Sequence, residues 1–475
     1  MLWIALYIPE FSLQIAARGM VHERAMAIKD GPANHPIVIA ASGQALALGI
    51  QLGMPVAAAE ALTSKLLVVP RNKDNETHAL YRFAVWALQF TPTVTLQPYQ
   101  GILLEVASTL RLQGGLRALL TNLASGCAQL GYSVMYGIAP TARAAWWFAL
   151  AKANGATIAD IVDTKHLRGQ LGKLQTNTLD LPAPTIALFE MLGIRTLADC
   201  LALPRAEFTQ RFGTELTRAL DQALGLHPDV RSIFAMPKAF HSRIELPAEV
   251  TEIDALLFPI KRLLIEMEGF LSGLGAGIQT LRVELEQGSK QRATFKIGLL
   301  APERDQQRLL MLISAKLTNL QLDHSVWAVS LHAEQLLAFN GKQSSFLVDQ
   351  LSHQLAWRQL LEKLQVRLGK ERVQTLALAN DHRPEYAWSV NNVTQCNVEN
   401  HYPLRPLWLL REPRAIGGMG DMALLAGPER IEAGWWDGRI AQRDYYIARN
   451  GKGAVLWIYR QHRDPTRWYV HGVFA

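Results

Sequence analysis

Short apolar runs closed by proline or glycine are the first pattern along the chain. Residues 2–8 form an unbroken apolar run that stops at Pro9, and residues 102–106 form a second run after Gly101. Apolar runs of this length, bounded by turn residues, are typical of buried strands. We expect these two strands to lie side by side at the centre of one sheet.

Strand-like and helix-like segments alternate through the first part of the chain. The pattern predicts further strands at residues 36–41 and 132–138, and helices at residues 75–89, 115–130 and 141–152. This alternation is typical of an α/β sheet that carries helices on its faces.

Two helix–turn–helix units follow between residues 181 and 225, each with a glycine at its turn. Helix-hairpin-helix modules use such turns to point the unbonded first-turn amides of the second helix at a phosphate. The expected DNA contacts, including two arginines that add charge, are Gly193, Ile194, Arg195, Thr196, Arg211 and Gly213. The alternative is a plain helical subdomain whose glycines only cap helices.

The rest of the chain predicts two more folded parts. Residues 239–333 show the strand-helix-strand-strand-helix-strand order of a split βαβ layer, with charges that nearly cancel. A polar linker at residues 340–345 precedes an expected helix at residues 350–368 and a hairpin at Asn450-Gly451. We expect a small β domain at the end of the chain, with most of four tryptophans in its core: Trp435, Trp436, Trp457 and Trp468.

The basic composition favours a protein that binds nucleic acid. The chain has 475 residues, enough for several domains, and a net charge of +7. Residues 351–475 hold 17 Lys and Arg against 12 Asp and Glu. Cys127, Cys200 and Cys396 show no metal-binding spacing, which favours a reduced cytoplasmic location. We expect no membrane span and no signal peptide, because the first apolar run breaks at Pro9.

Candidate chemistry is sparse. Metal-assisted phosphoryl transfer needs clustered carboxylates that hold two ions about 4 Å apart. The two central strands offer no carboxylate pair, since Glu10 and Glu105 each stand alone. The chain also has no Walker loop, zinc spacing or nucleophile elbow. We therefore expect neither a metal site nor a cofactor.

The order of parts in residues 1–340 resembles the Y-family translesion DNA polymerases. Residues 41–50 (ASGQALALGI) with Gly53-Met54-Pro55 are similar to the family's fingers segment. Residues 134–143 are similar to its palm strand and following helix, and residues 192–197 to its thumb hairpin. The resemblance implies an α+β multidomain protein with a polymerase-like palm, fingers, thumb and little finger, plus a small C-terminal α/β region. The implied parts are palm and fingers 1–165, helix-hairpin-helix thumb 166–235, little finger 236–340, linker with a clamp-binding peptide 341–349, and C-terminal partner-interaction region 350–475.

The chain departs from this family where the family binds metal and nucleotide. The metal-binding carboxylates correspond to positions without any carboxylate, and the degenerate positions are Ala5, Tyr7, Gln100 and Gly101. The Tyr and Arg that contact the nucleotide correspond to Gly43 and Leu46, and the palm lysine to Ala142-Arg143. Two magnesium ions would lack compensating charge in such a site. The resemblance therefore implies a palm without catalysis.

The C-terminal region resembles one branch of the family, the catalytically inactive, polymerase-like subunits of the bacterial mutasome. The similar segments are 381–385, 427–431, 434–436, 443–446 and 468–475. This resemblance implies a non-catalytic adaptor of translesion DNA synthesis and mutagenesis in the SOS response to DNA damage. The implied partners are DNA, bound without sequence preference, the β sliding clamp, an error-prone C-family DNA polymerase and an ImuA/RecA-like protein.

A clamp-binding peptide is expected in the linker, as Gln343-Ser344-Ser345-Phe346-Leu347. Phe346 and Leu347 would fill an apolar pocket while Gln343 bonds at its rim, as a few anchors can dominate a peptide interface. A rival segment is residues 335–339, which we expect to be buried at the end of the little finger. The alternative is an ordinary linker whose hydrophobic residues bind no partner.

Two other functions stay open from the sequence. One is an active Y-family DNA-directed DNA polymerase with atypical metal ligands, using Glu10 or Glu105. The other is a DNA-binding module outside translesion synthesis.

Overall fold

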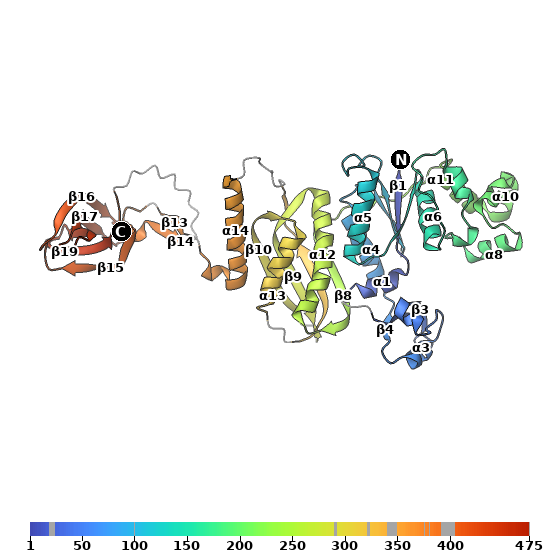
Figure 1. Cartoon of the computed structure of the whole chain (residues 1–475), viewed down its shortest axis with the longest axis horizontal. Helices are drawn as coiled ribbons and strands as arrows, with labels where there is room; N and C mark the ends of the chain where they lie inside the picture. The colour runs from blue at the N-terminus through green and yellow to red at the C-terminus, as the bar shows by residue number, and fades with distance from the viewer. Residues whose placement is uncertain are drawn as a thin grey trace. The chain divides into compact units, whose positions relative to one another are not determined.

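The computed structural model describes residues 1–18, 24–98, 100–288, 292–320, 324–339, 349–374, 376–379, 381–390 and 404–474 (Figure 1). The chain forms two compact units, Met1–Arg367 and Leu368–Ala475. Separate helix-covered sheets in the first unit and a β-rich second unit confirm the predicted α+β multidomain class. Within the described ranges, no helix is long and apolar enough to cross a membrane.

The palm sheet has four antiparallel strands, in the order β5 (Val94–Gln97), β6 (Gly101–Glu105), β1 (Trp3–Tyr7) and β7 (Met135–Ala139). The two strands that the sequence placed at the centre are neighbours, with Ala5 opposite Leu103 and Tyr7 opposite Gly101. The prediction of two adjacent central strands is therefore confirmed.

Side chains alternate between the two faces of this sheet, as strand geometry requires. The even-numbered residues of β1 pack with α4 (Lys73–Ala87) and α5 (Leu116–Leu130), whereas Ala5 and Leu103 pack with α6 (Ala142–Ala153). Helix α6 comes very close to the sheet at Gly137, where a Cβ would lie 2.2 Å from the Ala145 carbonyl oxygen. Both faces are therefore covered by helices.

A small three-stranded sheet is inserted between β1 and α4. Its strand order is β3-β2-β4, and it surrounds a core of its own. The sequence indicated the β3 strand but missed the other two, because their apolar runs are only a few residues long. The elements of this segment are α1 (Phe11–Ala17), β2 (Met26–Asp30), β3 (Ile37–Ala41), α2 (Gly43–Ala47), α3 (Val56–Leu62) and β4 (Leu67–Pro70).

The thumb segment is a group of short helices that shares one apolar core with α6. Phe189, Phe208 and Phe212 pack ring against ring inside it. Its helices are α7 (Leu167–Gly172), α8 (Ala183–Met191), α9 (Leu197–Ala202), α10 (Arg205–Phe212) and α11 (Thr214–Leu224).

The little-finger segment has the predicted strand-helix-strand-strand-helix-strand order. Its sheet runs β10-β9-β11-β8, and a short strand, β12, pairs with β9. The elements are β8 (Phe240–Val250), α12 (Ile253–Leu274), β9 (Ala276–Gln287), β10 (Arg292–Glu303), α13 (Gln306–Leu317), β11 (Val326–Ala333) and β12 (Leu336–Ala338). The expected helix at residues 350–368 is α14 (Asp349–Leu368).

Helix α12 packs directly on palm helix α4, and glycines make this possible. A Cβ on Gly269 would lie 2.6 Å from Cδ1 of Trp86, and one on Gly273 would lie 3.2 Å from the Leu88 backbone. Close approach of two helices needs small residues at the contact, so the little-finger segment is seated on the palm helices (Figure 1).

The second unit contains the small hairpin of β13 (Leu376–Leu378) with β14 (Trp388–Val390), and a five-stranded antiparallel sheet in the order β15-β19-β18-β17-β16. Trp457 is buried, as expected, but Trp435 is 78% exposed and Trp436 is 56% exposed. These two tryptophans fall in the β16–β17 connection, outside the sheet, so the core prediction is wrong for them. The strands are β15 (Trp408–Ile416), β16 (Ala423–Ala433), β17 (Ala441–Arg449), β18 (Val455–Gln461) and β19 (Asp464–Val473).

Candidate nucleic-acid interface and palm site

At the centre of the palm sheet, the positions that correspond to the carboxylates of the Y-family polymerases are tightly packed. Ala5 has no exposed surface and lies in the core beneath α6. A Cβ on Gly101 would lie 2.0 Å from the Leu6 carbonyl oxygen. Because that contact is far inside van der Waals distance, β6 holds no side chain here unless the backbone moves.

Tyr7 and Gln100 complete this end of the two strands. The Tyr7 ring meets the Trp146 ring edge to face, with centroids 5.6 Å apart. Burial raises the pKa of Tyr7, and the nearby Glu10 charge adds to the shift. Gln100 contributes its backbone, since its carbonyl accepts a hydrogen bond from the Ile8 N–H at 2.8 Å.

The two lone carboxylates are at opposite ends of the sheet. Glu105 pairs with Trp3, four residues along β1 from Tyr7, which is about 13 Å at strand spacing. Its Oε1 accepts hydrogen bonds from the Leu2 N–H at 3.1 Å and the Ala107 N–H at 3.3 Å, which hold the half-buried side chain at this end of the strand. Glu10 follows the other end of β1, and burial raises its pKa. Glu10 and Glu105 are therefore too far apart to bind the same two metal ions.

Metal-ligand side chains elsewhere in the described parts of the chain are also dispersed. Across the described parts of the chain, no group of three or more His, Cys, Asp or Glu side chains is arranged to hold a metal ion. Cys127 and Cys200 are both buried, and burial raises the pKa of each thiol to about 12. Neither thiol is therefore a ready metal ligand near neutral pH.

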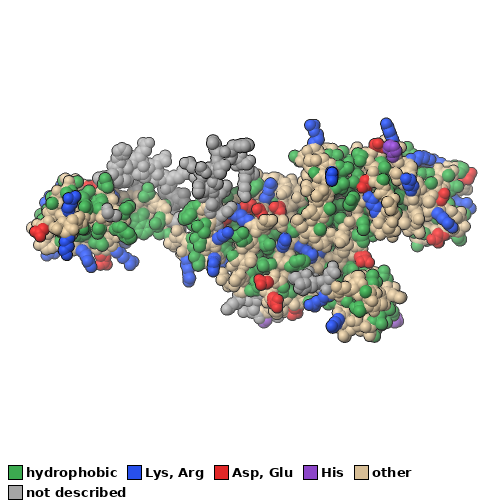
Figure 2. Space-filling model, in the orientation of Figure 1, with side chains coloured by type: hydrophobic (Ala, Val, Ile, Leu, Met, Phe, Trp, Pro, Cys, Tyr) green, Lys and Arg blue, Asp and Glu red, His purple; other side chains and the backbone are tan. Residues whose placement is uncertain are grey.

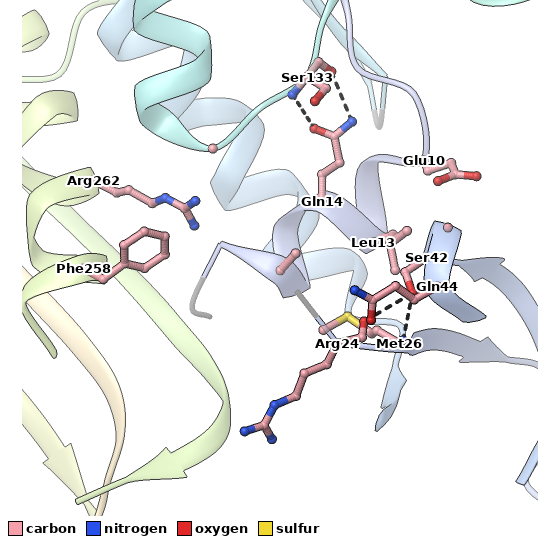
Figure 3. Close-up of a pocket in the computed structure, with 13 residues that line it drawn as sticks. Glu10, Leu13, Gln14, Arg24, Met26, Ser42, Gln44, Ser133, Phe258 and Arg262 are labelled. Atoms are coloured by element: carbon pink, nitrogen blue, oxygen red, sulfur yellow. Dashed lines mark hydrogen bonds between the residues drawn. The ribbon is translucent and has the colours of Figure 1, made fainter. Parts of the chain in front are cut away.

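A cleft of 580 Å³ opens beside the β1–α1 turn, between α1, the inserted sheet and α12 (Figure 3). Gln14 crosses its upper part, donating to the Pro9 and Ser133 carbonyls and accepting from the Ser133 N–H. In Figure 3, Arg262 lies at the left on α12, Arg24 lies at the bottom beside Met26, and Glu10 lies at the right. The cleft has a mixed polar and apolar lining, and the side chains that line it include no clustered carboxylates.

Gly43 and Leu46, which correspond to the nucleotide-contacting Tyr and Arg of the Y-family polymerases, have no polar side chain that could contact a nucleotide. Gly43 lines the cleft with open space around it, and Leu46 is 47% exposed. The Ser42 hydroxyl is used locally, because it accepts the Ala45 N–H and caps helix α2. This cap explains the helix start, and it adds no ligand group.

The first thumb turn is already occupied by a carboxylate. Gly193 takes the left-handed conformation, with φ of 70°, and Ile194 is buried. The N–H groups of Arg195 and Thr196 both donate to Oδ2 of Asp199, at 3.0 and 2.9 Å. These bonds lower the pKa of Asp199. The prediction that this turn offers unbonded amides to a phosphate is therefore wrong for these two N–H groups.

The second thumb turn is open. Gly213, with φ of 88°, ends α10 and begins α11. No described residue accepts a hydrogen bond from the N–H groups of Thr214, Glu215 or Leu216, and Arg211 is exposed in the last turn of α10. First-turn amides of this kind are anion-binding groups. Of the two predicted turns, this one keeps its donors.

The sequence contained a signal for the blocked turn that the prediction did not use. Thr196 followed three residues later by Asp199 has the spacing of a capping box, and the structure contains that box.

The Lys and Arg side chains visible in Figure 2 are scattered and form no single broad patch on that face. Charge alone therefore does not mark the interface.

The predicted clamp peptide, residues 343–347, lies outside the described residues, as does the linker at 340–345. The rival segment is within them and forms β12 on the edge of the little-finger sheet. It is not buried as expected, since Leu337 is 38% exposed. The reason is that, among the described strands, β12 is paired with β9 alone.

The chain is similar to known proteins, both in part and over most of its length. A model of the impB/mucB/samB family matches residues 6–149. The ImuB protein of Caulobacter vibrioides strain NA1000 / CB15N is 28% identical over 480 aligned residues, which cover 90% of this chain and 100% of the relative. The ImuB protein of strain ATCC 19089 / CIP 103742 / CB 15 matches equally. The chain is thus similar to ImuB over most of its length. The predicted resemblance to ImuB is thereby confirmed.

Solved structures that the chain matches include DinB from Sulfolobus solfataricus, which is 14% identical with a TM-score of 0.39, over 72% of this chain and 100% of that one. A Y-family polymerase chimera, Dbh-Dpo4(243-245)-Dbh, is 14% identical with a TM-score of 0.40, covering 71% and 99%. An insertion ternary complex of Dbh DNA polymerase is 13% identical with a TM-score of 0.40, covering 72% and 100%.

Proposed function

We propose that this ImuB-like chain is a non-catalytic adaptor of damage-induced mutagenesis and translesion DNA synthesis in the cytoplasm. The observation that carries the proposal is the pairing of β1 with β6. Ala5 is buried, Gly101 has no room for a Cβ, and Glu105 is bonded at the far end of the strand. A palm with this geometry can keep its shape while it lacks the ligands for two magnesium ions.

The adaptor would hold DNA weakly through its thumb. The open amides after Gly213, together with Arg211 and Arg195, suit phosphate contacts that do not depend on base sequence. Binding of this kind weakens steeply with salt.

Protein partners would dock elsewhere on the chain. The clamp would take the peptide at residues 343–347, and the C-terminal unit would meet the C-family polymerase and the ImuA/RecA-like protein. Trp435 and Trp436 are exposed and in edge contact, with ring centroids 5.5 Å apart. Tryptophan is enriched at the energetic centre of protein interfaces, which supports a docking role for this connection.

Primer extension separates an adaptor from an enzyme. The purified chain is incubated with a primed template, nucleotides and Mg²⁺ or Mn²⁺, beside an active Y-family polymerase as the positive control. We expect no extension by this chain. Metal-dependent extension that Glu105→Ala abolishes would instead establish the alternative, an active polymerase with atypical ligands.

A clamp pull-down tests the adaptor assignment. Replacing Gln343, Phe346 and Leu347 by alanine is expected to abolish binding to the β clamp. The matched control replaces Gln335 and Leu337, on and beside β12, and is expected to leave binding intact. If the triple variant still binds the clamp, the peptide assignment is wrong.

A further inference from the structure

Arg82 of α4 is a buried cation without a hydrogen-bond acceptor. The residue is 8% exposed, and its Nε is fully buried. No described residue accepts a hydrogen bond from its guanidinium, and the Oε2 of Glu266 lies 3.7 Å from its Nε. Buried charged groups are normally paired and hydrogen-bonded, because desolvation is otherwise uncompensated.

The nearest carboxylate is already committed to other partners. Glu266 Oε1 lies 2.5 Å from Nη2 of Arg18, and Glu266 Oε2 accepts the Ser242 hydroxyl. Arg262 adds a further cation beside Arg18, to whose carbonyl it donates. The cluster therefore holds more arginines than carboxylates, and burial lowers the pKa of Arg82.

Arg82 lines a pocket of 390 Å³ between palm helix α4 and little-finger strand β8. Arg243 and His241 line the β8 side of this pocket, and His78 and Tyr81 line the α4 side. The ring of His241 stacks on His332 at 4.3 Å, which fixes its orientation. Arg82 is thus one of several donor-bearing side chains that line the pocket, while its buried Nε lies nearest to Glu266.

Carboxylates near the pocket are accounted for. Glu245 lies 2.6 Å from Nη1 of Arg243, and Glu286 lies 2.9 Å from Nε of the same arginine. Neither is bonded to Arg82. The donor set left for a ligand is therefore centred on Arg82, with the two imidazoles as additional groups.

We propose that this pocket binds a phosphate group, with Arg82 as its central donor. A guanidinium presents a planar fork of donors that matches two phosphate oxygens, and imidazoles can bond the others. Tyr81 is 41% exposed at the rim and packs edge-on against Phe234, with centroids 4.8 Å apart. An exposed aromatic ring beside a phosphate site suits a nucleic-acid strand, whereas the phosphate chemistry alone would also accept the free ion.

Calorimetric titration of the full chain with inorganic phosphate, at constant ionic strength, tests the site. We expect Arg82→Gln to weaken binding by about tenfold or more, the loss that follows from one charge-assisted hydrogen bond. The matched control is Arg117→Gln, an exposed arginine on α5 outside the pocket, which is expected to bind like the parent chain. Because Arg82 is buried, His78→Ala at the exposed rim is the second variant, with a smaller expected loss and an unchanged fold.

The source of the phosphate follows from a second arm with a labelled single-stranded oligonucleotide. If a strand occupies the pocket, free phosphate competes with it and both Arg82→Gln and His78→Ala weaken it. If only free phosphate responds to the variants, the site binds the ion alone. Absence of phosphate binding to the parent chain, or equal binding by all variants, overturns the proposal. It is independent of the adaptor function, which primer extension tests separately.

Discussion

Arg18, at the end of α1, has its Nη2 2.5 Å from Oε1 of Glu266 on α12, and both side chains are almost fully buried. The same guanidinium donates to the Leu130 carbonyl at 2.8 Å and to the Tyr132 hydroxyl at 2.7 Å. One side chain thus joins the palm to the little-finger segment. An ion pair of this kind defines how the segments sit together, because neither charge has another opposite charge as close.

Breaking this pair is expected to be costly. Glu266→Gln leaves Arg18 without its paired carboxylate, and loss of one partner of a buried pair costs about 3–5 kcal/mol. The free energy of unfolding from denaturant titration measures the loss. Glu190→Gln, an exposed residue on α8, is the control and is expected to change little. A loss below about 1 kcal/mol for Glu266→Gln would show that the pair is not a stabilising contact.

Restoring the missing carboxylates is expected to fail. The double variant Ala5→Asp with Gly101→Asp places a Cβ at 101 against the Leu6 carbonyl and a charge in the core beneath α6. We expect destabilisation of more than about 2 kcal/mol and no primer extension. Ala5→Ser is the milder control. Metal-dependent extension by the double variant would mean that the palm backbone can still rearrange into a working site.

DNA binding is expected to depend on the second thumb turn. Arg211→Gln removes an exposed charge beside the open amides of α11, so affinity for primed DNA should fall at every sequence and the salt slope should weaken by about 1. Fluorescence anisotropy at several salt concentrations measures both quantities. Arg168→Gln on α7 controls for loss of one exposed charge. Equal losses for the two variants would place the interface elsewhere.

The C-terminal unit is expected to loosen in mild acid because of His471. Burial lowers the pKa of His471 to about 4, whereas an unfolded histidine titrates near about 6.5. Above that pH the imidazole is neutral in both states, and between the two values only the unfolded chain binds the proton. Stability therefore falls as pH falls across this window and levels off below it.

Hydrogen exchange of peptides from residues 441–474 measures this effect in the full chain. His471→Gln is expected to flatten the pH dependence between about 6.5 and 4, the window between the two pKa values. It also changes the contact between His471 and the Tyr445 hydroxyl, which lie 2.7 Å apart, so the slope with pH is the informative quantity. An unchanged slope would mean that another group dominates the acid response.

Several features were predictable from the sequence because they are local. The apolar runs of β1 and β6 have the length and boundaries of buried strands, and those strands pair as expected. The exposed Trp435 and Trp436 were misjudged because hydrophobicity does not tell a core residue from one in a connection. The blocked thumb turn was missed although its Thr196–Asp199 spacing was visible.

The sequence was sufficient to predict most strands and helices, although it missed β2 and β4, and it shows directly that Ala5 and Gly101 are not carboxylates, because these features depend on residue type and on neighbouring residues. The packing of the folded chain places Glu10 and Glu105 at opposite ends of the sheet, and within the described ranges it leaves the guanidinium of Arg82 without a hydrogen-bond acceptor. These facts depend on which distant segments meet: Glu266 reaches Arg18 from the little-finger helix, and packing across the sheet and between helices sets such meetings.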